Sequence, residues 1–326
     1  MTEANTSPNT SPNPNQRLPV DGRAALLMVG LCAIWGMQQT ALKAAAPDMA
    51  PVLQISLRSG LAAVAIAALV FLRGEGHALR GGAWKPGLAI GVLFALEYLF
   101  MGEGLRFTSA SHMGIFLYTA PIFTALGLHV GLPEERLSPL QWLGIALAFA
   151  GVAVSFLGGA GFGATGGGAR DSAWIGDLMG IGAGASWGAT TLTLRFSKLS
   201  HAPSTVTTLY QLLGAFVLLG VLALATDQTH VALTPLLGVS LAFQTVGVSL
   251  VSLLVWFGML RIYLASRLGV LSFMTPLFGV AFGVALLGER LEPAFIVGAA
   301  MVIAGILLVS GHEMLRARQA RRAAIG

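Results

Sequence analysis

One stretch of this sequence occurs twice, and the repetition limits what the chain can fold into. Residues 110–151 and residues 265–305 can be laid over each other with a single one-residue slip. Each copy is a long apolar run, a short charged turn and a second apolar run, so each predicts a helical hairpin of membrane length. The identical pairs are Ala110/Ala265, Ser111/Ser266, Gly114/Gly269, Pro121/Pro276, Glu135/Glu289, Arg136/Arg290, Leu137/Leu291, Pro139/Pro293, Gly144/Gly298 and Gly151/Gly305.

The remainder of the two halves repeats more faintly. Trp35-Gly36 corresponds to Trp187-Gly188, and Pro51 before one apolar run corresponds to Pro203 before another, at the same offset. The chain therefore divides into two related halves with flanking segments. These are a tail at 1–23, a first five-helix repeat at 24–158, a Gly-rich linker at 159–173, a second five-helix repeat at 174–311 and a basic tail at 312–326.

The composition identifies the membrane as the solvent of this chain. Hydrophobic residues make up 55%, charged residues only 10%, and the mean hydropathy is +0.77, whereas soluble domains carry about 25% charged residues. Apolar runs of about 18 residues or more predict spanning helices. We expect an all-α integral membrane protein with ten transmembrane helices, at 25–45, 51–71, 86–106, 108–129, 138–158, 174–194, 204–225, 237–260, 267–288 and 292–312.

The terminal segments and the linker carry no sign of a packed core. Residues 1–23 are rich in Asn, Pro, Thr and Ser and predict a disordered tail, without the basic start and apolar core of a cleaved signal peptide. The basic tail at 312–326 is expected to meet anionic lipid headgroups rather than nucleic acid. Residues 161–166 match GxGxxG, but no predicted strand precedes them, so we interpret them as flexible linker.

The distribution of Lys and Arg predicts the orientation. Of the 19 such residues, 14 fall on the side that holds both termini, 4 on the opposite side and 1, Arg58, inside a span. We therefore expect both termini in the cytoplasm of a multi-pass protein of the cytoplasmic membrane. Because each half has an odd number of spans, the second half must enter from the opposite face. The halves then form an inverted repeat, which is typical of secondary transporters that bind their substrate near the midplane.

The sequence resembles the ten-helix EamA-type members of the drug/metabolite transporter superfamily. The resemblance rests on the two Trp-Gly pairs, on Pro121 and Pro276, and on the repeated Glu-Arg-Leu turns followed by a Gly-containing helix, and it covers nearly the whole membrane region. It implies a basket of helices around a central cavity, and outward transport of small organic solutes, often amino acids or related metabolites. The family is broad, so the resemblance leaves the substrate open.

Two charged residues, Arg58 and Glu97, lie well inside predicted spans. A charge at the bilayer centre costs about 2.5 to 3.5 kcal/mol on insertion scales, so each marks a candidate functional site. Counted from the expected outer surface, they lie at depths of roughly 10 and 14 Å. Either they bind the carboxylate and ammonium of a zwitterionic solute, with Glu97 as a candidate for proton coupling, or they form a structural ion pair that braces their helices.

Polar and aromatic residues on the first helix of each half are further candidates for lining a substrate cavity. Gln38 and Gln39 follow Trp35 by three and four residues, on one helix face. Thr190 and Thr191 stand in the same relation to Trp187. Interhelical hydrogen bonding, worth about 0.6 kcal/mol on average, is the alternative role. Weaker candidates are Tyr98, His112, Tyr118, Tyr210 and Gln211; His112 also fits a position at the level of the lipid headgroups.

The matched prolines, glycines and charged turns are interpreted as structural. Pro121 and Pro276 are expected to kink their helices, and the glycines spaced by four over residues 176–188 to allow close helix packing. The turns at 135–136 and 289–290 precede predicted helix starts, where acidic charge and a following proline are favourable. We expect these turns to set the topology and not to bind substrate.

Together these features predict a secondary active transporter that moves a small metabolite outward by alternating access. Proton coupling through Glu97 is one hypothesis. A multidrug or metabolite exporter or exchanger without proton coupling is the main alternative, with a channel or a membrane-embedded enzyme as more distant ones.

The sequence gives no reason to expect catalysis or a cofactor. It contains no GxxxxGK[ST] motif and no cluster of His, Asp or Glu that suggests a reaction, so we expect no enzyme activity. Cys32 is the single cysteine, which excludes an internal disulfide and a cysteine metal site, and we expect neither cofactor nor metal. The expected partners are a small-molecule substrate and membrane lipids, with no nucleic acid. A homodimer is compatible with the sequence.

Overall fold

The computed structural model describes most of both halves. The described residues are 21–79, 82, 84–131, 138–158, 172–263, 268, 271, 272, 274–305, 307 and 308. The expected tails and linker therefore lie almost wholly outside the described residues, as does the turn at Glu135 and Arg136.

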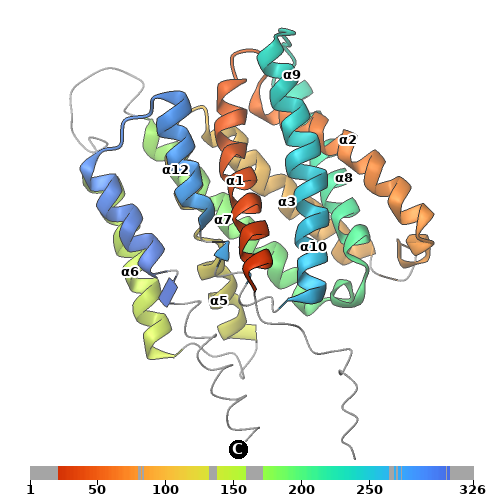
Figure 1. The fold of residues 1–326 in the computed structure, drawn as a ribbon, viewed down its shortest axis with the longest axis horizontal. Coiled ribbons are helices and arrows are strands. Elements are labelled where there is room, and N and C mark those ends of the chain that lie inside the picture. The colour runs from red at the N-terminus through yellow and green to blue at the C-terminus, as the bar shows by residue number, and fades with distance from the viewer. Residues whose placement is uncertain are drawn as a thin grey trace, which may run out of the picture.

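The first half folds into helices joined by short turns (Figure 1). Pro51 occupies the first turn of the second helix, where its missing N–H needs no partner. The helices are α1 (Gly22–Ala44), α2 (Pro51–Leu72), a 3-10 turn η1 (Glu75–Leu79), α3 (Trp84–Gly104), α4 (Ala110–Leu117), α5 (Ala120–Gly131) and α6 (Pro139–Gly158).

The second half repeats this course in its described part. Its third span contains a ten-residue π-helix, which is unusual because π-helices mostly occur as single turns. The elements are α7 (Ala173–Phe196), a 3-10 turn η4 (Lys198–His201), α8 (Ser204–Ala225), α9 (Pro235–Ala242), the π-helix η5 (Phe243–Ser252), α10 (Leu253–Ile262), α12 (Met274–Leu287) and a last helix at Pro293–Gly305.

Each of the ten predicted windows contains a helix, and two of the windows hold interrupted helices. The window at 108–129 is broken at Tyr118 and Thr119, so that Pro121 falls in the first turn of α5. The window at 237–260 changes its hydrogen-bond register twice, from α9 into η5 and from η5 into α10. Six helical stretches are long and apolar enough to cross a membrane, namely 22–44, 51–72, 84–104, 110–131, 204–225 and 235–256.

The two halves run in opposite directions. Lys43, near the end of α1, donates a hydrogen bond to the carbonyl of Thr108, and the Thr108 hydroxyl donates to Asp177, near the start of α7. The end of one half's first helix and the start of the other's therefore lie together. We call this end of the bundle the distal end, and the end where α1 begins the proximal end. In Figure 1 the distal end is at the top.

Equivalent contacts recur across the interface between the halves. A Cβ on Gly36 of α1 would come within 2.7 Å of the Phe278 Cβ on α12, and a Cβ on Gly188 of α7 would come within 2.8 Å of the Phe123 Cβ on α5. The two phenylalanines each stand two residues after a matched proline. In the same way, α3 packs on α7 and α8 as η5 packs on α1 and α2. This is the contact pattern of an inverted repeat.

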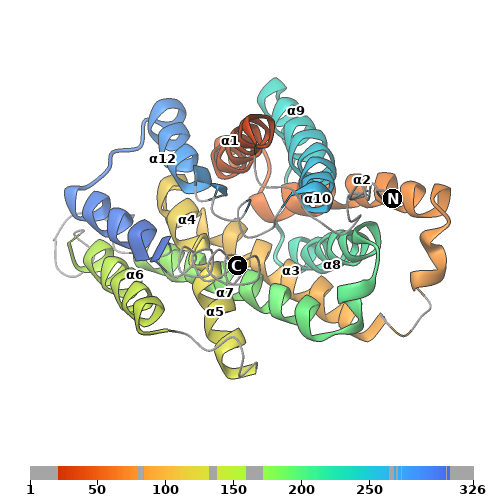
Figure 2. The same ribbon diagram turned by 60° about the horizontal axis from the view of Figure 1, so that its bottom comes forward.

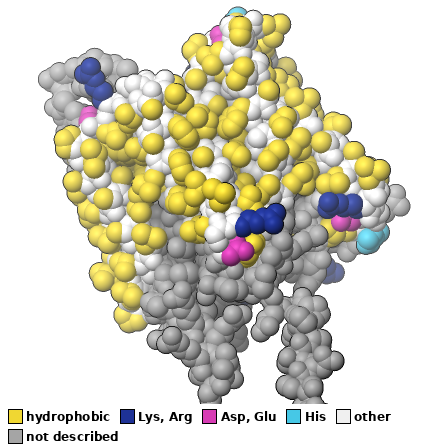
Figure 3. Space-filling view, viewed as in Figure 1, with side chains coloured by type: hydrophobic (Ala, Val, Ile, Leu, Met, Phe, Trp, Pro, Cys, Tyr) yellow, Lys and Arg dark blue, Asp and Glu magenta, His cyan; other side chains and the backbone are white. Residues whose placement is uncertain are grey.

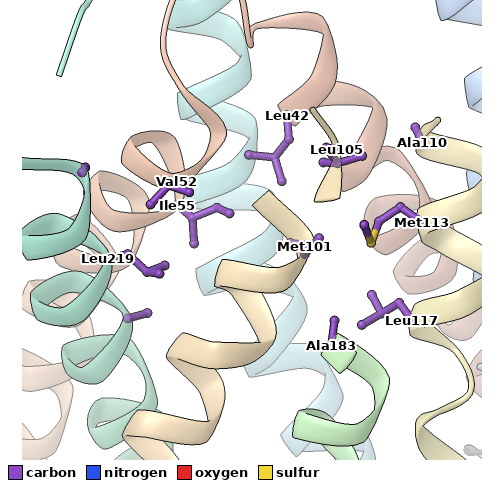
Figure 4. Packing of buried hydrophobic residues seen from close by; sticks show 12 residues of the cluster. Leu42, Val52, Ile55, Met101, Leu105, Ala110, Met113, Leu117, Ala183 and Leu219 are labelled. Atoms are coloured by element: carbon purple, nitrogen blue, oxygen red, sulfur yellow. The ribbon is translucent and has the colours of Figure 1, made fainter. Parts of the chain in front are cut away.

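The centre of the bundle is packed with apolar side chains from both halves. In Figure 2, α1, α4 and α7 lie between α12 and α6 on one side and α2 and α8 on the other. Close packing holds such helices together, because lipid gives little hydrophobic driving force for their association. Figure 4 shows the central cluster of buried side chains, which include Leu42, Val52, Ile55, Met101, Leu105, Ala110, Met113, Leu117, Ala183 and Leu219.

The surface between the two ends is apolar. Figure 3 shows hydrophobic side chains over most of the described part of the visible face, with few charged side chains among them. Val64 of α2 and Val239 of α9, for example, are 72% and 68% exposed. An apolar surface of this extent is suited to lipid and not to water. The fold is therefore that of a multi-pass membrane protein.

Candidate functional site

Arg58 and Glu97 are both buried in the bundle. Arg58 lies on α2, seven residues after Pro51 begins the helix, and Glu97 lies on α3, seven residues before Gly104 ends it. The exposed fraction is 2% for Arg58 and 8% for Glu97. At about 1.5 Å per residue, each is roughly 10 Å from the distal end of its helix. The two charges therefore share one depth.

The guanidinium of Arg58 has an aromatic neighbour but lacks acceptors at two nitrogens. Its Cζ lies 4.6 Å from the centroid of the Tyr98 ring, and its buried Nε and Nη1 have no hydrogen-bond partner. Arg58 is a charged neighbour of Glu97, but the two do not form an ion pair within 4.0 Å in this conformation. Because a buried cation without hydrogen-bond acceptors is costly, the unpaired Nε and Nη1 make Arg58 a candidate to bind an anion.

Of the two predicted glutamines on α1, Gln38 joins this site and Gln39 does not. The Gln38 amide donates to the Met101 sulfur at 3.6 Å and also lies beside Tyr98. The Gln39 amide, oriented toward its acceptors, donates to the carbonyls of Trp35 at 2.8 Å and Gly36 at 3.2 Å. Gln39 is thus satisfied within its own helix.

Trp35 connects α1 to the π-helix of the other half. Its Nε1 donates to the Ser252 hydroxyl at 3.0 Å, and its ring meets the edge of Trp256 with centroids 5.6 Å apart. Ser252 is the last residue of η5. At the repeat offsets, Ser249 and Ser252 of η5 fall where the first half carries Glu97. The sequence gave no signal for the change to π-helical hydrogen bonding.

Trp187 lies near the same centre, whereas the two threonines that follow it are turned into their own helix. The Trp187 ring meets the ring of Tyr118 at right angles with centroids 5.4 Å apart. Tyr118 has Tyr98 and Glu97 among its electrostatic neighbours. The Thr190 hydroxyl donates to the Ser186 carbonyl, and that of the exposed Thr191 to the Trp187 carbonyl.

Tyr210 lies away from this centre, toward the proximal end. Its ring packs against Gly87 of α3, and its hydroxyl donates to the Leu79 carbonyl at 3.3 Å. Gln211 is half-buried beside it on α8. The residues that the structure does bring together are Gln38, Arg58, Glu97, Tyr98 and Tyr118, which we call the central site.

A second polar group at the distal end was not predicted. Asp177 of α7 is 4% exposed and accepts a hydrogen bond from Thr108. The His112 Nδ1 lies 3.1 and 3.0 Å from the two Asp177 carboxylate oxygens, and the His112 ring stacks on Phe295 at 3.9 Å. The one signal in the sequence is a carboxylate early in an apolar window. Its position near the end of a span made it look like an ordinary surface residue.

Glu289 closes the same end by capping a helix of the other half. Its carboxylate accepts hydrogen bonds from the Ala110 N–H at 2.7 Å, the Ser111 N–H at 3.0 Å and the Ser111 hydroxyl at 2.6 Å. These groups form the start of α4. The sequence predicted that this acidic residue precedes the start of the next helix along the chain, whereas its carboxylate contacts the start of α4. The equivalent Glu135 lies outside the described residues.

Comparisons with known proteins agree with this architecture. A relative from Bacillus subtilis strain 168, the uncharacterized transporter YoaV, is 24% identical over 88% of this chain and 96% of its own. Relatives from Salmonella typhimurium and Escherichia coli K12, each named "Probable amino-acid metabolite efflux pump", are both 26% identical. They cover 91% and 88% of this chain, and 97% and 94% of their own lengths.

The fold has also been observed in a solved structure. One crystal structure matches with a TM-score of 0.62 at 20% identity, over 92% of this chain and 99% of the other. Residues 22–157 and residues 174–311 each match the same family. With both inverted halves matched in this way, the chain belongs to the EamA-like transporter family.

Proposed function

We propose that this protein is a secondary active transporter of the cytoplasmic membrane that exports an amino acid or a related small metabolite by alternating access. The observation that carries the proposal is the central site, where Arg58, buried and without acceptors at Nε and Nη1, lies at the depth of Glu97. Two relatives named as amino-acid metabolite efflux pumps support this substrate class. Inverted halves supply two equivalent arrangements of one interface, as alternating access requires.

An amino acid would complement the central site in charge and in shape. Its carboxylate would accept the hydrogen bonds that Arg58 Nε and Nη1 lack, and charge-assisted bonds of this kind are the strong ones. Its ammonium would lie near Glu97. The rings of Tyr118 and Trp187, which meet at 5.4 Å, offer an apolar wall for the substrate's side chain.

Glu97 is proposed to couple transport to a proton gradient. One carboxylate can be neutralised by a substrate ammonium or by a proton, and each disfavours the other. If Glu97 binds substrate on one side of the membrane and a proton on the other, each cycle exchanges one substrate for one proton. The corresponding region of the second half carries Ser249 and Ser252 instead of an acid, so this exchange would take place in the first half alone.

The proposed orientation assigns each end of the bundle to one side of the membrane. We assign the proximal end to the cytoplasm, because 14 of the 19 Lys and Arg residues fall on the side of the termini. The distal end, with Asp177 and Glu289, then faces the outside.

Uptake of labelled amino acids into proteoliposomes that hold the purified protein tests the proposal. Wild type and Glu97→Gln are compared with and without an imposed pH gradient. Glu292→Gln is the matched control, because Glu292 is exposed at the start of the last helix. We expect the gradient to stimulate uptake in the wild type and in the control, and to have no effect in Glu97→Gln.

Two other outcomes would change the proposal. Uptake that is equal in all three proteins and insensitive to the gradient would reject proton coupling through Glu97 and favour exchange or facilitated release. If no amino acid is taken up by any of the proteins, the substrate class is rejected, and other metabolites and drugs become the substrates to assay.

A further inference from the structure

Two acidic residues of the second half hold the start of α4, which belongs to the first half. Asp177 bonds Thr108 and His112, and Glu289 caps the backbone at Ala110 and Ser111. The distal end cannot open between the halves without breaking these bonds. We call these six residues and Lys43, which donates to the Thr108 carbonyl, the distal clasp.

Within the distal clasp, the His112–Asp177 pair is placed to exchange a proton with the distal solution. The Asp177 side chain is 5% exposed, whereas that of His112 is 24% exposed. One edge of the imidazole is therefore at the surface, and its Nδ1 contacts the buried carboxylate. Stacking on Phe295 at 3.9 Å, with 8° between the ring planes, holds the ring in this orientation.

We propose that His112 and Asp177 form a second proton-binding site, separate from Glu97, and that a proton bound there stabilises the closed distal end. Histidine is the side chain whose charge commonly changes between pH 5 and 8. A neutral imidazole N–H makes a hydrogen bond to the Asp177 carboxylate, and an imidazolium adds the attraction of an ion pair to the same contact. Acidification of the distal side would therefore tighten the clasp.

The other charges of the clasp are already engaged. Lys43 of α1 donates to the Thr108 carbonyl and has Glu289 as its charged neighbour. Glu289 directs its oxygens at the start of α4. Asp177 is thus the acid bonded to the His112 imidazole, and no other titratable residue hydrogen-bonds to that ring among the described residues.

This inference rests on the proposed alternating access and adds a role for the outside pH. After substrate leaves through the distal end, a proton from the outside would bind the pair as the clasp reforms. An acidic exterior would favour the return to the distal-closed conformation. Opening would release the proton to the side from which it came, so this site regulates the cycle without itself coupling transport to the gradient.

Accessibility of a buried cysteine at the distal end tests the inference without measuring transport. Thr40 suits the reporter, because it is 2% exposed, lies one turn below Lys43 on α1, and its hydroxyl has no partner to lose. In a Cys32→Ala background, Thr40→Cys is labelled with a membrane-impermeant maleimide between pH 8 and pH 5.5. The comparison variants are His112→Gln, Asp177→Asn and the control His230→Gln, since His230 is an exposed histidine in the turn after α8.

The chemical pH dependence of the maleimide reaction is common to all variants and cancels in their ratios. We expect acidification to slow labelling roughly fivefold more with His112 and Asp177 intact than in either variant, as a gain of about 1 kcal/mol in a hydrogen bond to a charged group implies. His230→Gln should behave as the wild type. If acidification changed the labelling rate by the same factor in all four proteins, the inference would be wrong.

The outcome is independent of the proposed substrate. Equal amounts of monodisperse protein, with full labelling after denaturation, establish that each variant is folded and carries its reporter. If labelling responds to pH as expected but no amino acid is transported, the clasp stands and the substrate proposal fails. If an amino acid is transported but the pH dependence of labelling is the same without His112, the substrate proposal stands and the clasp proposal fails.

Discussion

The guanidinium of Arg58 lies over the ring of Tyr98, with 4.6 Å between its Cζ and the ring centroid. A cation–π contact of this kind stabilises a desolvated cation by about 2 kcal/mol. The buried Nε and Nη1 of the same guanidinium have no acceptor among the described residues. Their N–H groups are therefore left for an oxyanion.

Arg58→Gln should remove the preference for a carboxylate. We expect the KM for a transported amino acid to rise roughly 10- to 100-fold, because hydrogen bonds to charged groups contribute about 1.5 to 3 kcal/mol. The amide of the same amino acid is the control substrate, and its KM should change little. Arg58→Lys, which keeps the charge, should recover part of the loss. An equal loss for acid and amide would show that Arg58 only supports the fold.

Trp35 and Ser252 should be coupled in stability. The Trp35 Nε1 donates to the Ser252 hydroxyl across the two halves at 3.0 Å, and such interhelical bonds in membranes contribute about 0.6 kcal/mol on average. Trp35→Phe and Ser252→Ala should each lower the midpoint of thermal unfolding in detergent, and the double variant should lower it by less than the sum. Ser249→Ala, on the same π-helix, is the control. Strict additivity of the two changes would count against the bond.

Alanine at Gly36 and at Gly188 should destabilise the protein in the same way. A Cβ at Gly36 would lie 2.8 Å from the Gly279 backbone nitrogen, and a Cβ at Gly188 would lie 3.1 Å from the Ala120 carbonyl oxygen. Overpacking of this kind costs about 1 to 3 kcal/mol. Gly30→Ala on α1 is the control, because a Cβ there meets nothing within 4 Å and alanine favours helix by about 1 kcal/mol. Thermal unfolding should separate the three, with Gly30→Ala at or above the wild type.

The start of α1 should loosen in acid. The N–H of Ala24 donates to the Asp21 carboxylate at 2.7 Å, and this bond lowers the pKa of Asp21 below its usual range. A lowered pKa means that the stabilisation is fully present above about pH 4 and is lost as the pH falls through the folded-state value. Amide hydrogen exchange at residues 22–25, corrected for intrinsic rates, should therefore accelerate in acid. Asp21→Asn keeps a capping oxygen without a charge, so a similar acid response in that variant would contradict this account.

The sequence was sufficient to predict the ten spans, their duplication and the inverted arrangement. Lipid requires long apolar runs, and the repeat is recognisable from identical residues at matched positions of the two halves. It did not predict where helices are interrupted. The run from Pro235 to Trp256 is apolar enough to be predicted as one span, and the Gln244-Thr245 pair just after the start of the π-helix does not by itself indicate a change of hydrogen-bond register. Hydrogen-bond register inside such a run depends on packing against α1 and α2, which composition does not record.

The site was predictable only in part, for a related reason. The cost of burying charge singled out Arg58 and Glu97 from the sequence. Their neighbours depend on how α2 and α3 pack, so the contact of Arg58 with the Tyr98 ring could not be inferred from spacing. Glu289 shows the same limit. Its position in a charged turn suggested that it caps the next helix, whereas its partners Ala110 and Ser111 lie in the other half of the chain.

Glu289→Gln should loosen the distal end at every pH. The carboxylate accepts three hydrogen bonds from Ala110 and Ser111, and an amide would turn a donor toward donors. Bonds to a charged group contribute about 1.5 to 3 kcal/mol, so the reporter Thr40→Cys should react about tenfold faster or more. Glu292→Gln, at an exposed position near the same turn, should leave the rate unchanged.

A second variant tests the same contact without altering a charge. A Cβ at Gly283 would collide with the Glu289 carboxylate and the Ser111 hydroxyl. Gly283→Ala should therefore displace the carboxylate and accelerate labelling as Glu289→Gln does. If both variants lowered the thermal unfolding midpoint but left the labelling rate unchanged, Glu289 would stabilise the bundle without controlling access. Faster labelling in both would identify the contact between Glu289 and the start of α4 as part of the distal closure.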